Sequence, residues 1–512
     1  MNYKVYLTVN MLRANTGGLG KSVCTRVNML NSEGKHVEIL STTFNKNVNS
    51  VRKELLDSGR LTSNAILRNM FEELAGDKKG SLDSAVNFVD NRKSIYHPVN
   101  EVGYAVAPGD KKYSYRLYKN GVYLKYKMYD EMENLQFIDY FSEQRVRLKR
   151  ETFDEKGYLN RVEYIDSRTN KTNVICYINN SGHCYLSTWI NSSTGEVTKV
   201  TLFRNNTDFV KEFNNEEELK KYWIEEYVIK NDEKPIIISD IRGLDNLVLS
   251  LENDRLAKVA VMHNNHFVEP FTYGAKIKKH KMNLFDNAHR MDAIVFLTEQ
   301  QLDDGSRQFG KMTQYTVISH SAPVIEKNDS RREDYTIISL SRYDDRKRLD
   351  HIIKAFKLVV EKAPQAKLEL WGMGPEEDKL RKIIKDLRLS DNVFLKGFTS
   401  NATEVFERAT ASVLTSKHEG FGLVITESMA AGAPVISYNV LYGPNDIIND
   451  GVDGIIVENN NITALAKAII DFLSNDEMKK SMSREARKVS QKFSFAEYTK
   501  KWLDFFETIS LK

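Results

Sequence analysis

The sequence predicts an α/β protein with two doubly wound domains and an antiparallel sheet inserted into the first. Strand and helix signals alternate near the N-terminus and again after about residue 235, as parallel α/β layers require. Between them the pattern changes to tyrosine-rich alternating runs broken by turn dipeptides. At 512 residues the chain is also longer than one hydrophobic core usually organises.

The first domain opens with a strand signal at residues 3–9, a glycine turn, a helical stretch from about residue 20 to 32, and a second strand signal at residues 36–42. Alternation resumes later with the strand signals PIIISD, AKVAVM and DAIVFLT. We therefore predict a discontinuous first domain, residues 1–99 and 206–325.

The intervening residues 100–205 are predicted to form an antiparallel sheet. Its hairpin turns are marked by Asn120-Gly121, Lys156-Gly157, Ser181-Gly182 and Thr194-Gly195. From Glu101 to Asn205 the chain holds 17 of its 52 aromatic residues, more than its share by length. Such a surplus suggests faces that another chain covers.

A polar stretch at residues 326–334 precedes a second strand and helix series, which predicts a second doubly wound domain over residues 326–490. The last helical segments, around residues 478–491 and 495–509, have no strand after them. We expect residues 491–512 to return to the first domain.

Composition limits the function. Lys and Arg outnumber Asp and Glu by 74 to 70, a net charge of +4, which by itself does not indicate nucleic-acid binding. Three cysteines without metal-type spacing suit a reducing compartment. No signal peptide is recognised and no apolar run approaches the ~18 residues of a membrane span, so we expect a cytoplasmic protein.

The stretch NTGGLGKS, residues 15–22, matches a variant phosphate loop at its glycines, lysine and serine. Two features oppose an ATP site: the preceding strand signal ends near Val9, and the next strand lacks an Asp for Mg²⁺. A purely structural turn is an alternative. In a third interpretation the amides of Gly17, Gly18 and Leu19 face a diphosphate held by a second domain.

The segment SKHEGFGLVITESMAAGAPVIS carries Glu419 and Glu427, with seven residues between them. Taken alone, the two carboxylates are explained as well by a structural role, as solvated charges or charges near a helix start, as by a functional one. A glycosidase pair is disfavoured, because eight helical residues separate the two groups by ~12 Å whereas glycosidases need ~5–9 Å.

This segment resembles the Glu-x7-Glu signature of retaining glycosyltransferases with the GT-B architecture, two facing Rossmann-like domains. The flanking segments ISLSRYDDRKRLD, LELWGMGPEEDKL and VFLKGF stand in the order and spacing of that superfamily's nucleotide-binding domain. The resemblance covers both α/β domains, and the GT-B fold of two facing Rossmann-like domains, with an antiparallel β-sheet insertion in the first, is what it implies.

The resemblance also implies site roles. Arg342 and Lys347 match the cations that hold the donor diphosphate and offset the charge growing on the leaving phosphate. Glu427 matches the carboxylate that binds the ribose hydroxyls, and Glu419 the carboxylate near the donor sugar's anomeric carbon. The remaining matches are Gly397 and Phe398 beside the base, and Phe421, Gly422 and Leu423 as backbone amides.

In the first domain, His263 directly follows a strand signal at the edge where α/β ligands collect. The resemblance gives it the place of a histidine that faces the transferred sugar, a match that His266 fits less well. Gly17 and Gly18 match the superfamily's glycine turn, which implies contact with a nucleotide-sugar diphosphate. Asp-x-Asp is absent from the sequence, so we expect neither a metal nor a cofactor.

The inserted sheet, VAVMHNNH and LYGPNDII resemble bacterial wall teichoic acid α-glycosyltransferases of the poly(glycerol-phosphate) or poly(ribitol-phosphate) type. This implies transfer of glucose or N-acetylglucosamine from UDP-sugar to a polyol-phosphate hydroxyl with retention, and a homotrimer built through the insertion. The basic runs at residues 145–150 and 276–281 suit an anionic acceptor, though such runs are often solvated faces.

The resemblance implies at most peripheral association with the inner membrane face and no nucleic-acid partner. Two rivals stay open: an O-glycosyltransferase of serine-rich adhesins that works with a companion subunit, and a non-catalytic scaffold whose working surface is the tyrosine-rich sheet.

Overall fold

The computed structural model describes residues 3–13, 17–76, 93–204, 208–326 and 332–510. The chain divides into two compact units. We call Asn2–Thr16 with Val23–Leu256 the N-terminal unit, and Met1, Gly17–Ser22 and Ala257–Lys512 the C-terminal unit. The predicted domain boundaries stay a prediction, and of the polar stretch at 326–334 the residues 327–331 lie outside the described ones, as do Asn15 and Thr16.

Four parallel strands form the α/β layer of the N-terminal unit, in the order β14-β1-β2-β3. Strand β1 pairs with β2, the next strand in sequence, and with β14, which follows the whole inserted sheet. The predicted insertion into an α/β layer is thereby confirmed. The elements are β1 (Lys4–Val9), α1 (Gly18–Ser32, of which Gly18–Ser22 belong to the C-terminal unit), β2 (His36–Ser41), α2 (Val48–Asp57), β3 (Ile66–Asn69), α3 (Met70–Leu74), α5 (Glu216–Trp223), β14 (Pro235–Ser239) and α6 (Asp245–Ser250).

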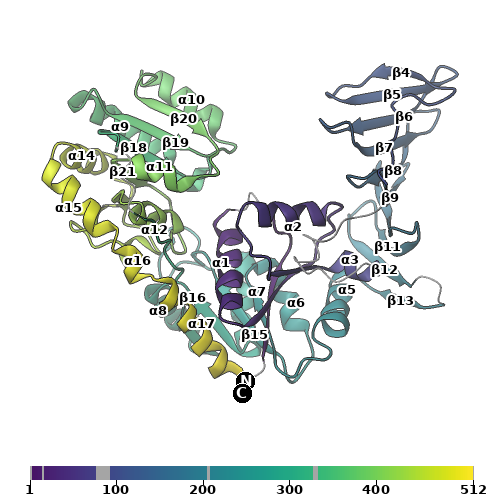
Figure 1. Cartoon of the computed structure of the whole chain (residues 1–512), viewed down its shortest axis with the longest axis horizontal. Helices are drawn as coiled ribbons and strands as arrows, with labels where there is room; N and C mark the ends of the chain where they lie inside the picture. Colours follow the sequence, from purple (N-terminus) through teal and green to yellow (C-terminus); the bar gives the residue numbers. More distant parts are fainter. Residues whose placement is uncertain (1–2, 14–16, 77–92, 205–207, 327–331, 511–512) are drawn as a thin grey trace. The chain divides into compact units, whose positions relative to one another are not determined.

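Ten antiparallel strands, β4 to β13, form the inserted sheet and follow one another in it as they do in the sequence (Figure 1). The predicted turn between β5 and β6 is confirmed, because Asn120 and Gly121 both have positive φ, 51° and 80°, as a two-residue hairpin turn requires. The strands are β4 (Ala105–Pro108), β5 (Ser114–Lys119), β6 (Val122–Tyr129), β7 (Leu135–Phe141), β8 (Arg147–Phe153), β9 (Leu159–Asp166), β10 (Lys171–Ile178), β11 (Cys184–Ile190), β12 (Val197–Phe203) and β13 (Val210–Phe213).

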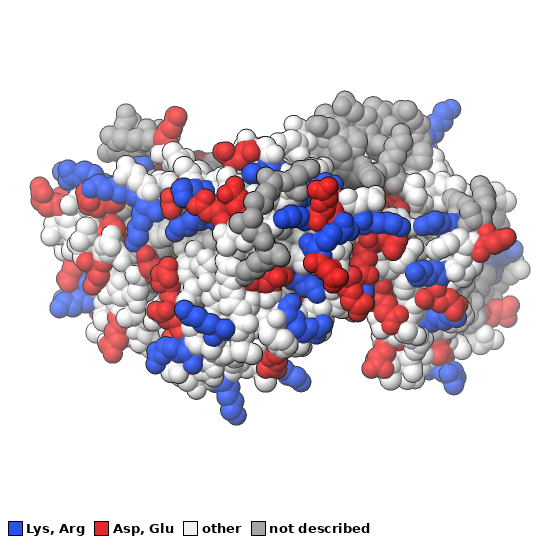
Figure 2. Space-filling view, turned by 90° about the horizontal axis from the view of Figure 1, so that it is seen from below, with Lys and Arg blue, Asp and Glu red and all other residues white. Residues whose placement is uncertain are grey.

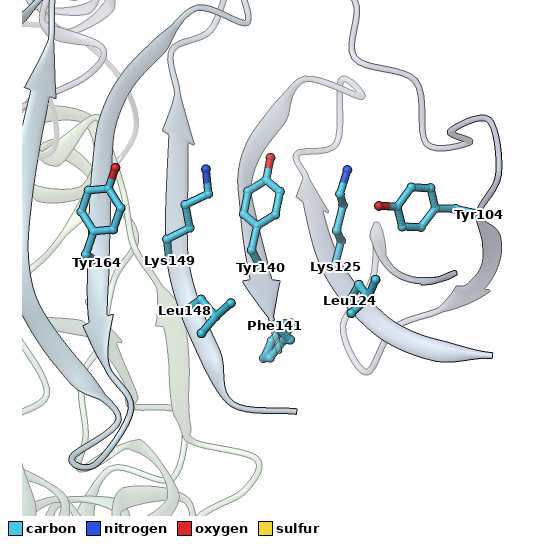
Figure 3. Close-up of a pocket in the computed structure, with 8 residues that line it drawn as sticks. All are labelled: Tyr104, Leu124, Lys125, Tyr140, Phe141, Leu148, Lys149 and Tyr164. Carbon is cyan, nitrogen blue, oxygen red and sulfur yellow. The ribbon is translucent and has the colours of Figure 1, made fainter. Parts of the chain in front are cut away.

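One face of this sheet carries a row of alternating lysines and tyrosines. Lys125, Tyr140, Lys149 and Tyr164 are successive cross-strand partners on β6, β7, β8 and β9, and their polar heads point to the same side (Figure 3). The two ammonium groups lie 5.5 and 4.5 Å from the Tyr140 ring centre. The row lines a cavity of about 350 Å³, and Tyr164 is 45% exposed, in agreement with the expected exposed aromatic face.

The C-terminal unit contains a six-stranded parallel sheet in the order β20-β19-β18-β21-β22-β23. Helices α9 and α14 lie side by side on it (Figure 1) and bury Ile352, Phe356 and Ile469 in its core. Its parallel strands and helices are β18 (Thr336–Leu340), α9 (Leu349–Lys362), β19 (Lys367–Trp371), α10 (Glu377–Asp386), β20 (Val393–Gly397), α11 (Ala402–Arg408), β21 (Ala411–Leu414), α12 (Leu423–Ala430), β22 (Val435–Tyr438), α13 (Pro444–Ile447), β23 (Gly454–Val457) and α14 (Ile462–Leu473).

The same unit holds three further parallel strands, in the order β15-β16-β17, and the last helices of the chain. The predicted terminal helices are confirmed as elements, whereas the return of residues 491–512 to the first domain stays a prediction. The elements are β15 (Ala257–Met262), α7 (Lys279–Asp286), β16 (Ala293–Phe296), α8 (Glu299–Phe309), β17 (Gln314–Val317), α15 (Asp476–Ala486), α16 (Val489–Lys492) and α17 (Phe495–Ser510).

Among the residues that Figure 2 colours, charges of both signs are interspersed on the face that it draws. Within the described ranges, every helix is too short or too polar to cross a lipid bilayer. In the same ranges no three His, Cys, Asp or Glu side chains gather as metal ligands would. That the reaction needs no metal stays a prediction.

Candidate active site

Glu419 and Lys347 meet at the carboxyl ends of the neighbouring strands β21 and β18. Lys347 Nζ and Ser416 Oγ each donate a hydrogen bond of 2.6 Å to Oε1 of Glu419, whose side chain is 12% exposed. Burial alone raises the pKa of this carboxyl, but the Lys347 charge and the two hydrogen bonds outweigh it and hold the pKa below its usual value. The carboxylate is therefore ionised and paired at neutral pH.

Arg348 fixes the two loops that carry this pair. It precedes α9 with a left-handed φ of 46°, and its side chain is buried. Its guanidinium donates to the backbone carbonyl oxygen of Thr415 at 2.7 Å and to that of Ser416 at 2.6 Å. Arg348 was not predicted, because nothing in the run of three basic residues distinguishes the one that turns inward.

Glu427 lies on α12 and pairs with Lys21 from the first turn of α1. The two helix starts are also in contact, because a Cβ on Gly18 would stand 3.4 Å from Leu423 Cδ1. Gly17 accepts a hydrogen bond from the Lys21 amide at 3.2 Å. The structure thus brings the predicted glycine turn to the second glutamate. Lys21, which was matched only to the disfavoured ATP-binding phosphate loop, is a further charged group there.

Gly420 lets the loop after β15 approach the glutamate loop. A Cβ on this residue would lie 1.9 Å from the His263 carbonyl oxygen and 2.8 Å from the Asn264 Cα, both rigid backbone atoms. The backbone N–H of the buried residue Asn265 also donates to the backbone carbonyl oxygen of Glu419, 3.3 Å away. The predicted residues His263 and Glu419 therefore belong to one hydrogen-bonded cluster of loops, which only glycine at 420 permits.

The His263 ring stacks on the His320 ring, with centres 5.6 Å apart and planes 10° apart. His320 in turn meets the buried Phe421 edge to face, with ring centres 5.5 Å apart. Phe421 was predicted only for its backbone amide, and its side chain supports this column of rings. His320 was missed, since it follows β17 in a loop without a recognisable motif.

His266 is a core residue. Its side chain is fully buried between Phe267, Phe285 and Tyr442, and within the described part of the chain neither ring nitrogen has a hydrogen-bond partner. Burial, with smaller contributions from Lys281 and Lys278, lowers the pKa of His266 to about 3. The burial of His266 is consistent with the preference for His263, which stays a prediction.

The basic run at residues 276–281 is only partly a solvated face. Lys278 donates to the backbone carbonyl oxygen of Asn265 at 3.0 Å and to His418 Nε2 at 3.2 Å. Lys281 donates to the backbone carbonyl oxygen of Asn264 at 2.8 Å. Burial lowers the pKa of Lys278 to about 8 and that of His418 to about 4. Two lysines of the run therefore hold the His263 loop, while Lys276 and Lys279 are exposed.

The run at residues 145–150 is largely neutralised by carboxylates. Arg150 donates twice to Asp139, both times at 2.7 Å, and Arg147 lies 3.8 Å from the same carboxylate. Lys149 pairs with Glu151 at 2.6 Å. These charges stabilise the inserted sheet first, so they offer less to a polyanion than the sequence suggests.

Three further predicted residues, Arg342, Gly397 and Phe398, lie at or just after the ends of β18 and β20. The Arg342 side chain is 70% exposed and its Nε lies 3.8 Å from Asp344; no contact with Glu419 is found within the described residues. Gly397, with φ of 77°, ends β20 and accepts a hydrogen bond of 2.7 Å from the Gly372 amide. Phe398 follows it with 47% of its surface exposed. Gly422, which was also predicted as a site residue, precedes α12 with a φ of 93°.

Residues 322–489 match the family model described as glycosyl transferases group 1. This range contains Lys347, Glu419 and Glu427, together with the whole six-stranded sheet.

Two curated relatives match nearly the whole chain. The poly(glycerol-phosphate) alpha-glucosyltransferase of Bacillus subtilis (strain 168) is 29% identical over 97% of this chain and 74% of its own length. The poly(ribitol-phosphate) alpha-N-acetylglucosaminyltransferase of Staphylococcus aureus (strain COL) is 28% identical over 99% of this chain and 100% of its own length. A peptide N-acetylglucosaminyltransferase GtfA subunit of Streptococcus gordonii, 26% identical, covers only 58% of this chain.

The fold is that of a solved GT-B enzyme. A crystal structure of an S. aureus TarM mutant, in complex with Fondaparinux, alpha-GlcNAc-glycerol and UDP, has a TM-score of 0.86 to this chain. The two are 26% identical, and the match covers 99% of this chain and 100% of the other. The predicted fold class, two Rossmann-like α/β layers and an inserted antiparallel sheet, is confirmed.

Proposed function

We propose that this chain, which carries a glycosyl transferases group 1 domain, transfers glucose or N-acetylglucosamine from a UDP-sugar to hydroxyls of a polyol-phosphate chain of the wall teichoic acid type. The observation that carries the proposal is the buried, ionised Glu419 paired with Lys347 at the strand ends where α/β ligands bind. The similarity to two polyol-phosphate glycosyltransferases over almost the whole chain supports the acceptor class.

In the proposed reaction Glu419 contacts the donor sugar's hydroxyls and Lys347 and Arg342 hold the diphosphate. The bond between the anomeric carbon and the phosphate oxygen breaks as the acceptor oxygen bonds to that carbon from the same face. The acceptor proton passes to the departing phosphate oxygen, so configuration is retained without a side-chain nucleophile. The two cations offset the charge that develops on UDP, in place of a metal.

The remaining predicted residues keep, in this proposal, the roles that the resemblance implies. Glu427 takes the ribose hydroxyls, and the exposed Phe398 ring beside Gly397 offers a face to the base. The backbone amides of Gly17 and Gly18 at the start of α1, and of Phe421, Gly422 and Leu423 at the start of α12, face the sugar and the phosphates. His263 faces the transferred sugar. No cofactor takes part.

A homotrimer through the inserted sheet, a cytoplasmic location and peripheral contact with the inner membrane face complete the proposal. Tyr164 and Trp189 are both exposed and share one face of that sheet, because each is a cross-strand partner of Val174 on β10, and this favours an apolar contact with another copy. Size-exclusion chromatography with light scattering tests the subunit count, and a monomer at micromolar concentration would contradict it.

One donor and acceptor screen tests the reaction. Purified chain is offered UDP-glucose or UDP-N-acetylglucosamine, each with poly(glycerol-phosphate), poly(ribitol-phosphate) or a serine-rich peptide, and sugar incorporation is measured. Incorporation into a polyol-phosphate polymer is expected. Incorporation into the peptide alone would favour the adhesin-modifying rival. The similarity to a GtfA subunit supports this rival less, because it covers only 58% of this chain.

Thermal unfolding separates an enzyme from a non-catalytic scaffold. UDP that binds with micromolar affinity stabilises the fold by ~4 kcal/mol at millimolar concentration. A chain whose unfolding is indifferent to UDP and that transfers neither sugar would refute the proposed function.

A further inference from the structure

Lys21 is a charged group at the candidate site for which the proposed reaction has no task. Its ammonium group forms an ion pair with Oε1 of Glu427. The Lys21 side chain is 53% exposed, whereas that of Glu427 is 16% exposed. Solvent and ligands therefore reach the ammonium group more readily than the carboxylate that it neutralises.

The backbone around Lys21 is fixed, so its side chain is the movable part. The Lys21 amide donates to the Gly17 oxygen at 3.2 Å, and Ser22 Oγ donates to the Leu19 oxygen at 2.8 Å. Gly18 rests against Leu423, the first residue of α12. The first turn of α1 is thus anchored on α12, while the flexible four-carbon stem of a lysine lets the charge change partners.

A donor that uses Glu427 competes with this ion pair. Two vicinal ribose hydroxyls donate to both oxygens of one carboxylate, and Lys21 occupies one of these oxygens in the free protein. The same donor carries a diphosphate, attached to the ribose through a single methylene group. The ligand that displaces the ammonium group from Glu427 therefore brings a stronger anionic partner to its neighbourhood.

We propose that Lys21 is a donor-binding residue that exchanges partners, pairing with Glu427 in the free protein and with the donor diphosphate in the complex. The assignment rests on the proposed function, in which Glu427 takes the ribose. In the free protein the ammonium group offsets a largely covered carboxylate, and in the complex it offsets phosphate charge. Lys21 is then a third cation for the leaving group, beside Arg342 and Lys347.

Calorimetric titration of the full chain with uridine and with UDP tests this exchange. Lys21→Met is expected to bind UDP about tenfold more weakly, since it loses a charge-assisted contact. Its affinity for uridine is expected to equal or exceed that of the unaltered chain, because the carboxylate no longer has to release a cation. Added salt should weaken UDP binding less in this variant. Lys53→Met, an exposed lysine on α2, is the matched control.

Two results overturn the assignment while leaving the proposed function intact. If Lys21→Met binds UDP as tightly as the unaltered chain, Lys21 does not contact the diphosphate. If it loses uridine and UDP affinity by the same factor, Lys21 only orients Glu427. An unaltered chain that binds no UDP refutes the proposed function itself and this assignment with it. Should Lys21→Met fail to fold, Lys21→Gln keeps a polar head and gives the same readout.

Discussion

Lys347 donates a 2.6 Å hydrogen bond to Glu419, joining two residues that are 72 positions apart in the sequence. The lysine is one quarter exposed and the carboxylate is nearly covered. The ammonium group of Lys347 is therefore more accessible to solvent than the carboxylate of Glu419 with which it pairs.

Removing any one of the three predicted charges Glu419, Arg342 and Lys347 should lower turnover, whereas the effect on stability should differ among them. Glu419→Ala, Arg342→Ala and Lys347→Ala are each expected to reduce turnover by ~10² or more at saturating donor, because each loses a charge partner of the transition state. Lys347→Ala should also lower the free energy of unfolding by ~1–3 kcal/mol, since it leaves a buried carboxylate without its cation. The exposed Arg342 should leave stability unchanged.

The readouts are initial rates and thermal unfolding, and Lys357→Ala on the exposed side of α9 is the control. Unchanged turnover in all three variants would overturn the site assignment.

Gly420→Ala should disturb the contact between the two loops. The added Cβ would meet the His263 carbonyl oxygen at 1.9 Å, so the backbone must move. We expect the free energy of unfolding to fall by ~1–3 kcal/mol and turnover to fall with it. Gly243→Ala is the matched control, because a Cβ there meets nothing within 4 Å of the described atoms. Equal stability of the two variants, measured by chemical denaturation, would contradict the close approach.

Arg348→Lys should loosen the loop that carries Glu419. Lysine cannot reproduce the planar fork that reaches the oxygens of Thr415 and Ser416, so two buried acceptors lose their donor. We expect a loss of ~1–3 kcal/mol in the free energy of unfolding and a lower kcat. Arg381→Lys, on the exposed face of α10, should change neither. A kcat equal to that of the unaltered enzyme would show that Arg348 does not position the site.

His266→Phe should reduce the acid sensitivity of the fold. The pKa of His266 is lowered to about 3, mainly by burial, from an ordinary value of 6.5. Between those values the unfolded chain binds a proton that the folded chain does not, so the free energy of unfolding falls as the pH falls through this window. The variant lacks this titration and should gain about 2 kcal/mol relative to the unaltered chain between pH 6.5 and 5.

Denaturant unfolding at several pH values measures this difference, with the exposed His289→Phe as the control. A pH-independent difference between His266→Phe and the unaltered chain would place the titration elsewhere.

Lys276→Ala and Lys279→Ala test acceptor binding by the exposed half of the second basic run. If these lysines grip phosphates, each variant should raise the KM for a polyol-phosphate polymer several-fold and leave the KM for the UDP-sugar unchanged. The effect should fade at high salt, because exposed charges are screened. An unchanged KM at low salt would remove this run from the acceptor site.

Local patterns in the sequence predicted the elements well. The alternation of strand and helix signals, and the turn at Asn120-Gly121, depend on backbone geometry within a few residues. The position of the insertion was also predictable, because the α/β pattern resumes at β14, which pairs with β1. The sequence could not distinguish Arg342, which is exposed, from Arg348, which is buried.

The order of the elements, the inserted sheet and the segment that carries the two glutamates can be recognised from sequence patterns. The pairing of cations with carboxylates cannot, because it depends on packing: Lys347 reaches Glu419, and Lys21 reaches Glu427, 406 residues away in the sequence. The physical reason is that spacing along one helix or strand is set by local backbone geometry, whereas these pairs depend on which strand ends become neighbours and which side chains the packing leaves covered.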